Sequence, residues 1–413
     1  MYLRLLSPYL FFFCWIFLAI FPYIYNTNFF YEPLLIYFTG SALYYAYYAL
    51  TNYHVPVYFK VVFAFACFLS FYGIALIFLG DDVVWLTAGK NLRKYLYILW
   101  LVSSLLSVFP VYVFTCRGQL SEKGMKILFF LFLAASIYGF YGALKEQIMY
   151  AALMHTGQEE YTITAVYSFL SLLPLIVLFK KNQALQFILL AIMLFYFVMS
   201  SKRGAIILAG ITSILLIVSM VFHNSDKKKI ITIAMTSVLM VVAFVFISHQ
   251  IETSAYFSAR LDQTVDGYTS RREEYVKILL DYYFNNTTLG QFFTGIGAQG
   301  TLSVNESFAH NDWVAILLEQ GLFGALFYLL YWLTFVYTWV KSRVNYDAFV
   351  VIGLLIVVGF GKTLFSMYYL PISAEMMISS GYFAIALGYF LGKAFPQEDE
   401  ESDSLVDETV GEE

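Results

Sequence analysis

The feature that most constrains this chain is a succession of long apolar segments separated by short polar loops. Twelve such segments stand at roughly 8–25, 33–51, 58–80, 95–115, 125–143, 162–179, 183–200, 205–222, 230–248, 313–340, 347–369 and 372–392. A helix needs about 20 apolar residues to cross a bilayer. Charged residues make up 13% of the chain, against about 25% in soluble domains. The sequence therefore predicts an all-α polytopic membrane protein with about twelve transmembrane helices.

The distribution of Lys and Arg among the short loops sets the direction of these segments. With the N-terminus inside, 13 of these residues fall on the inner side and 6 on the outer side. Positive residues accumulate in cytoplasmic loops, so both termini are predicted to be cytoplasmic. The cluster "GKNLRK" at 89–94 runs against this rule. The N-terminal stretch has no small-residue cleavage site, which favours a retained first helix over a signal peptide.

Four regions follow from this pattern. Residues 1–248 hold the first nine helices, 249–310 form one large external loop with amphipathic stretches, and 311–393 hold the last three helices. Residues 394–413 form a tail with nine acidic residues and no basic ones beyond Gln397, which is typical of a disordered, solvated segment. Long loops in compact proteins are usually functional, so the external loop is the first place to seek a site.

Several kinds of chemistry find little support in the sequence. Cys14, Cys67 and Cys116 lie in or beside apolar segments without a C-x-x-C pair, which argues against disulfides and zinc. Asp81 and Asp82 form an acidic pair that lacks an obvious third ligand. No metal and no cofactor is therefore predicted. The external loop is not basic overall, so nucleic acid is a poor candidate partner.

Basic residues stand where the predicted outer loops meet the membrane. Lys202 and Arg203 occupy a tight turn in "SSKRGAI" between two apolar segments. A snorkelling pair at a helix end is one interpretation, but the outer position favours a functional cation. Arg271 and Arg272 open the amphipathic stretch "SRREEYVKILLDYYF", and Tyr275 follows Arg271 by four residues on the same helix face. An ordinary solvated helix start is the alternative there.

A histidine stands where the external loop re-enters the membrane. His310 and Asn311 precede the apolar segment at 313–340. Histidine titrates near neutrality, so it can accept a proton from a hydroxyl group; a helix cap is the alternative role. Glu319 lies deeper in the same predicted helix, ahead of Gly321 and Gly324. Small residues at this spacing allow another helix to approach closely.

Two ionisable residues are predicted at membrane depth in the last two helices. Lys362 and Glu375 lie in neighbouring segments, and a mutual ion pair is the simplest interpretation. A transporter or flippase is the alternative that these charges and the twelve helices would suit. Such folds usually show internal repeats, and none is evident here.

The order of these elements resembles the O-antigen ligase and O-antigen polymerase superfamily. His310-Asn311, nine residues and then Gly321-Leu-Phe-Gly324 are similar to that family's His-Asn-x9-Gly-x-x-Gly element. The turn "SSKRGAI", the arginine with an aromatic residue four positions later, and the Gly-x-Gly pair in "TGIGAQG" are similar to its other landmarks. The resemblance covers roughly residues 183–340.

The resemblance implies a GT-C-like bacterial enzyme that moves saccharides from polyprenyl diphosphate on the outer face of the cytoplasmic membrane. A polymerase would extend the glycan on a lipid-linked repeat, with a chain-length regulator protein as a conceivable partner. A ligase would attach it to the lipid A core. The resemblance implies that a base and two arginines carry the reaction without metal, namely His310, Arg203 and Arg271. Residues expected to help bind the substrate are Lys202, Arg272, Tyr275, Asn311 and Glu319.

Overall fold

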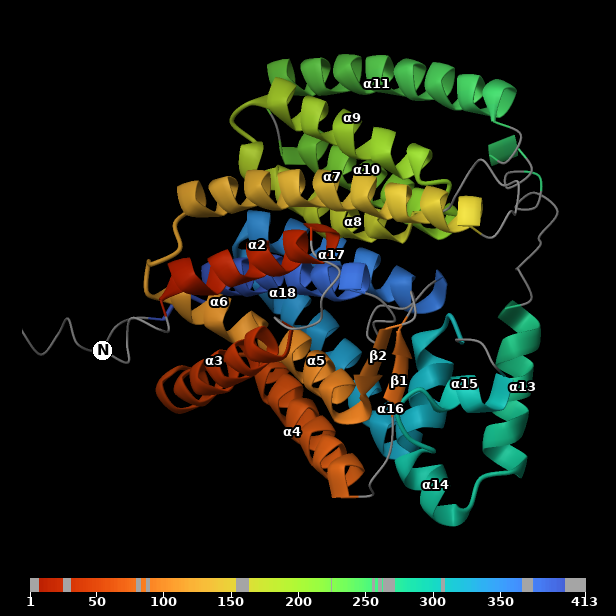
Figure 1. Cartoon of the computed structure of the whole chain (residues 1–413). Helices are drawn as coiled ribbons and strands as arrows, with labels where there is room; N and C mark the ends of the chain where they lie inside the picture. The colour runs from red at the N-terminus through yellow and green to blue at the C-terminus, as the bar shows by residue number, and fades with distance from the viewer. Residues whose placement is uncertain are drawn as a thin grey trace, which may run out of the picture.

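The structure is a computed structural model. It describes residues 7–24, 31–78, 83–86, 90–153, 163–223, 225–254, 257–258, 262, 272–305, 309–365 and 374–397. Each of the twelve predicted segments coincides with a helix or a run of consecutive helices (Figure 1). Within the described residues, seven helices are long and apolar enough to cross a membrane. The prediction of an all-α polytopic membrane protein is confirmed, and the number of crossings stays a prediction.

The first half of the chain contains α2 (Pro8–Ile24), α3 (Tyr31–Asn52), α4 (Val57–Phe78), α5 (Lys94–Leu106), α6 (Val108–Cys116), α7 (Glu122–Leu153), η1 (Thr164–Val166), α8 (Tyr167–Leu172) and η2 (Leu173–Phe179). The second half contains α9 (Gln183–Met199), α10 (Arg203–His223), α11 (Asp226–Thr253), α13 (Arg272–Asn285), α14 (Leu289–Thr294), α15 (Gly300–Asn305), α16 (Asp312–Lys341), η3 (Ser342–Val344), α17 (Tyr346–Phe365) and α18 (Ala374–Ala394). The loop between α4 and α5 contains an antiparallel pair, β1 (Val83–Leu86) and β2 (Lys90–Arg93).

Two predicted segments are interrupted rather than continuous. The segment at 95–115 breaks at Ser107 between α5 and α6, and Pro110 lacks the N–H group that would bond to the carbonyl of residue 106. The segment at 162–179 alternates between 3-10 and α geometry, with Pro174 near the start of η2. Irregular backbone at membrane depth is tolerated where protein covers it, and every residue of α8 and η2 is buried.

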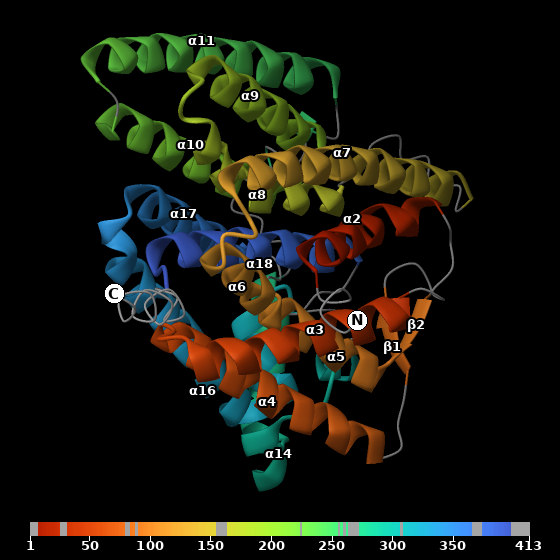
Figure 2. The same cartoon turned by 90° about the vertical axis from the view of Figure 1, so that its left-hand side faces the viewer.

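The helices stack in layers across the bundle. Figures 1 and 2 show α9, α10 and α11 on one side, α17 and α18 in the middle, and α3, α4 and α5 on the other side. In the outermost helix, α11, only 6% of the apolar window is buried, although this window has few charges. Exposed apolar surface of this extent is typical of a helix that faces lipid in a membrane protein.

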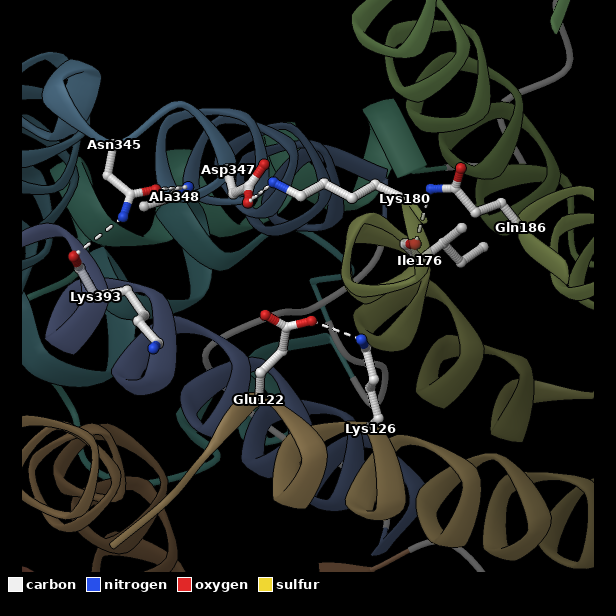
Figure 3. Close-up of polar contacts among 9 residues, drawn as sticks. All are labelled: Glu122, Lys126, Ile176, Lys180, Gln186, Asn345, Asp347, Ala348 and Lys393. Carbon is white, nitrogen blue, oxygen red and sulfur yellow. Dashed lines mark hydrogen bonds and ion pairs between the residues drawn. The ribbon is translucent and has the colours of Figure 1, made fainter. Parts of the chain in front are cut away.

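Polar contacts tie the loops together at one end of the bundle, drawn in Figure 3. Lys180, after η2, pairs with Asp347 at the start of α17. The amide nitrogen of Asn345 donates to the carbonyl oxygen of Lys393 at 3.1 Å. Exposed ion pairs contribute little stability, so this end is held mainly by the packing of the helices beneath.

The opposite end carries the elements of the predicted external loop. Figure 1 shows α13, α15 and the strand pair gathered there. Leu279 and Tyr283 of α13 are buried, and the Tyr283 hydroxyl donates to the carbonyl oxygen of Phe292 at 2.6 Å. A capping box formed by Thr288 and Gln291 starts α14. The loop therefore contains ordered helices that pack on α16.

Candidate functional site

The helix that follows His310 folds back on itself. Gly321 has φ 66° and ψ −166°, which breaks the helical geometry inside α16. The hydroxyl of Tyr328 donates to Oδ2 of Asp312 at 3.1 Å, although 16 residues separate the two. In a straight helix such residues lie about 24 Å apart along the axis. The prediction of one continuous helix over 313–340 is therefore wrong: a short helix from Asp312 packs back beside a longer one that begins after Gly321.

The Gly-x-Gly turn occupies the break in α16. The backbone N–H of Ile296 donates to the carbonyl oxygen of Leu318 at 2.9 Å, and that of Gly297 donates to the carbonyl oxygen of Glu319 at 3.1 Å. A Cβ atom on Gly295 would lie 2.1 Å from that same Glu319 oxygen. The turn thus satisfies carbonyl groups that the kink releases from the helix, and only glycine fits there.

Glu319 lies at the centre of this contact. Its side chain is 2% exposed, and the hydroxyl of Thr301 donates to its Oε1 at 3.2 Å. Its Oε2 is buried and accepts no hydrogen bond from the described residues. The hydroxyl of Tyr72, on α4, donates to its backbone oxygen at 2.7 Å. Glu319 therefore links α4, α15 and the kink of α16.

Left-handed backbone is concentrated in the same region. Among the described residues other than glycine, positive φ angles occur at Ser201 (50°), Gln299 (54°) and His310 (49°). Each lies in one of the three sequence elements noted above, the SSKRGAI turn, the TGIGAQG turn and the His-Asn pair. Such conformations persist where the surrounding structure enforces them, and they cluster at functional sites.

Positive charges from two other elements act on His310. Burial, and after it the charges of Arg272 and Lys202, lower the pKa of the half-buried His310 imidazole to about 4. Lys202 precedes α10, whereas Arg272 is the first residue of α13. The fold thus brings Lys202 of the turn at 200–204 and Arg272 of α13 near enough to His310 for their charges to act on it.

The remaining expected site residues have the following places. Arg203 is the half-buried first residue of α10, one position after Lys202. Tyr275 is half-buried in the first turn of α13. The side-chain oxygen of Asn311 caps α16 by accepting from the backbone N–H groups of Trp313 and Val314 at 3.0 and 3.3 Å. Arg271 lies outside the described residues, as do Asp81 and Asp82.

A buried lysine lies beside the start of α16. The Lys362 ammonium donates to the hydroxyl of Ser379 at 3.2 Å, lies 4.9 Å from the centre of the Tyr167 ring, and interacts with the charge of Asp312. The side chain of Glu375, its expected partner, lies outside what the structure describes. Asp312 follows His310 by two residues in the sequence. No sequence pattern, however, predicts its charge interaction with Lys362 of α17.

The fold and the site together define a polytopic membrane protein with a polar, cation-lined site at one end of its helix bundle. Residues 188–329 match the family model for O-antigen ligase, and this range contains all the sequence elements of the site. This match confirms the resemblance to the O-antigen ligase and polymerase superfamily over about a third of the chain. It implies a glycan-transferring enzyme in the broad sense. No curated protein matches the chain.

Proposed function

We propose that this protein is a glycosyltransferase of the bacterial cytoplasmic membrane that polymerises O-antigen or another surface polysaccharide from polyprenyl-diphosphate-linked units. The observation that carries the proposal is that the charges of Lys202 and Arg272 act on the half-buried His310, and all three residues lie within 188–329, the range that matches the O-antigen ligase model. A neutral imidazole beside fixed cations suits a reaction in which a hydroxyl loses its proton while an anion leaves.

The basic residues supply the donor site in this proposal. Arg203 and Arg271 hold the diphosphate of the donor, since guanidinium groups bind such oxygens in two-pronged fashion. Lys202, Arg272 and Tyr275 border the same site, with Asn311 and Glu319 on the side of α16. Each diphosphate oxygen that is neutralised makes the polyprenyl diphosphate a better leaving group.

The chemical step transfers one glycosyl group from the donor diphosphate to an acceptor hydroxyl. His310 removes the proton from an acceptor hydroxyl, whose oxygen attacks the anomeric carbon of the donor sugar. The bond between that carbon and the diphosphate oxygen breaks, polyprenyl diphosphate leaves with its negative charge, and the anomeric configuration inverts. A bound diphosphate also offsets the cations that lower the pKa of His310. Donor binding therefore strengthens the base when it is needed.

The arrangement in the membrane follows the four regions inferred from the sequence. Both termini lie in the cytoplasm, residues 1–248 and 311–393 form the membrane part, 249–310 form the external loop, and 394–413 form a cytoplasmic tail. The site then faces outside, where lipid-linked glycans are assembled. The acceptor is the next lipid-linked repeat, and a chain-length regulator would act on this step. Transfer to the lipid A core is the alternative within the family, and transport of lipid-linked sugar is the alternative outside it.

The replacement His310→Ala tests the proposal directly. Transfer by purified protein at saturating donor should fall by about 10²–10⁴-fold, the usual contribution of a general base, while donor binding is retained. The matched control is His249→Ala, an exposed histidine in the last turns of α11, which should behave as wild type. Wild-type transfer should also survive EDTA. Normal turnover by His310→Ala would overturn the proposed base, and loss of wild-type activity in EDTA would indicate a required metal.

The glycan profile of a deletion strain separates the remaining alternatives. Loss of long chains with one repeat still attached to the lipid core identifies a polymerase. Accumulation of long chains on polyprenyl diphosphate identifies a ligase. Unpolymerised repeats retained on the cytoplasmic face would identify a transporter and overturn the proposal.

A further inference from the structure

Two buried side chains of opposite charge lie on α16 and α17, and the one on α16 is close in sequence to the proposed base. Asp312 is 0% exposed and Lys362 is 1% exposed, and the charge of Asp312 acts on Lys362. The neighbouring pair confirms that α16 and α17 touch here, because the indole nitrogen of Trp313 donates to the Thr363 hydroxyl at 3.1 Å. Asp312 is the first residue of α16 and follows His310 by two positions.

Lys362 is itself held from the other side. Its ammonium donates to the Ser379 hydroxyl on α18, which donates to the backbone oxygen of Tyr167 at 2.8 Å. The hydroxyl of Ser171 lies 2.8 Å from that of Ser379. Lys362 is therefore fixed by two other elements, α8 and α18, and presents its charge to α16.

Asp312 is held by the second segment of its own helix. Its Oδ2 accepts from Tyr328 at 3.1 Å, which fastens the short first segment of α16 to the longer second segment. A buried carboxylate needs an opposite charge nearby, since an uncompensated one is strongly unfavourable. Loss of the lysine charge would move the start of α16 or admit water, and the residues that would move first are those at 310 and 311.

We propose that Lys362 is a positioning residue for His310 that acts through Asp312. The inference rests on the proposed function, because it takes His310 as the base. His310 holds a left-handed backbone conformation with φ 49° immediately before the capped helix, so its place depends on that first turn. A shift of about 1 Å at a reacting group lowers the rate by about 10²-fold.

Four variants test the role of the charge pair. Lys362→Met and Asp312→Asn should each lower kcat at least tenfold while changing the donor KM less than threefold. Lys362→Arg should keep most of kcat. The double variant Asp312→Asn/Lys362→Met leaves no uncompensated charge and should recover most of what either single variant loses. The control is Lys393→Met, an exposed lysine in the last turn of α18.

A second measurement reports the position of residue 310 without relying on transfer. His310→Cys is made in a background in which Cys14, Cys67 and Cys116 are replaced by alanine, and its rate of reaction with a small maleimide is measured. Adding Lys362→Met should change that rate at least fivefold, whereas adding Lys362→Arg or Lys393→Met should change it less than twofold. Should His310→Ala prove active, the proposed base fails while the labelling rate still reports positioning.

The outcomes that overturn the inference are specific. An unchanged labelling rate in the Lys362→Met background would show that position 310 does not depend on the lysine. Wild-type kcat in Lys362→Met would show the same. A double variant as poor as the single ones would show that the charge pair does not act as a unit. If Lys362→Met fails to fold, the kcat values of the double variant and of Lys362→Arg test the inference instead.

Discussion

Asp312 accepts a hydrogen bond from Tyr328, at 3.1 Å, across a turn that reverses the direction of α16. The reversal occurs at Gly321, and the polypeptide after this glycine is still about 20 residues long, enough to cross a bilayer unaided. The segment from Asp312 to Gln320 therefore dips back along the longer one. This places His310 beside packed helices instead of at the tip of a loop.

Replacement of Gly321 should destabilise the protein. In Gly321→Ala, a Cβ atom would lie 2.4 Å from the carbonyl carbon of Phe293, at a residue with φ 66°. We expect the midpoint temperature of unfolding in detergent to fall by several degrees and transfer to fall with it, since such strain is worth about 1–3 kcal/mol. Gly210→Ala, a helical position in α10 with no atom within 4 Å of the new Cβ, is the control and should be neutral or slightly stabilising. Equal midpoints for the two variants would contradict the reversal.

Two variants of Arg203 should separate the contribution of its positive charge from that of its guanidinium geometry. Arg203→Ala should lower transfer by about 10–100-fold, the usual effect of losing charge-assisted hydrogen bonds, and Arg203→Lys should retain part of it. Initial rates at several donor concentrations provide the measurement. Arg343→Ala, an exposed arginine at the opposite end of the bundle, is the control. Normal rates in Arg203→Ala at equal expression would remove the arginine from the diphosphate site.

The pH dependence of kcat/KM should report the cations around His310. The pKa of His310 is lowered to about 4, whereas an ordinary histidine has a pKa of about 6.5. The activity of the wild type should therefore begin to fall only at a pH well below that ordinary value. Arg272→Gln or Lys202→Gln removes a charge that lowers this pKa, so the acidic limb should move to higher pH. Burial, the larger cause, remains, and the shift should be partial. Lys277→Gln, an exposed lysine on the same helix as Arg272, should leave the limb in place.

The same pKa has a consequence for stability. A histidine whose pKa is lower in the folded protein favours folding above the unfolded pKa of about 6.5, and this contribution is lost as the pH falls toward about 4. Wild type should therefore lose more thermal stability between pH 6.5 and 4.5 than His310→Ala does. Parallel losses in both proteins would show that His310 is not held neutral.

The predicted sidedness can be tested by labelling at the two ends of the bundle. Asn286→Cys, exposed between α13 and α14, should react with a membrane-impermeant thiol reagent in cells with a permeable outer membrane. Arg343→Cys, exposed at the opposite end, should react only after lysis. Both variants are made without the three native cysteines. Labelling in the reverse order would invert the topology.

The sequence by itself determined the class of fold and the segment that matches the O-antigen ligase family. Apolar segments long enough to cross a bilayer identify helices without reference to any partner, because the backbone in lipid must satisfy its own hydrogen bonds. The His-Asn pair, the turn at Lys202 and Arg203 and the Gly-x-Gly pair are local patterns, and the family match at 188–329 contains all of them. The breaks at Ser107 and within 162–179 were missed, since uniform hydrophobicity conceals a change of helix geometry.

Only the tertiary structure decided how these elements meet. The reversal at Gly321 exists because the turn at Gly295 bonds to the carbonyl groups of Leu318 and Glu319, and no pattern within α16 encodes that contact. The charge interaction of Asp312 with Lys362 likewise depends on how the successive helices α16 and α17 pack. Hydropathy is a property of each segment alone and can therefore be evaluated from the sequence. Strain, charge pairing and the lowered pKa of His310 depend on which distant groups pack together, which is settled only when the chain folds.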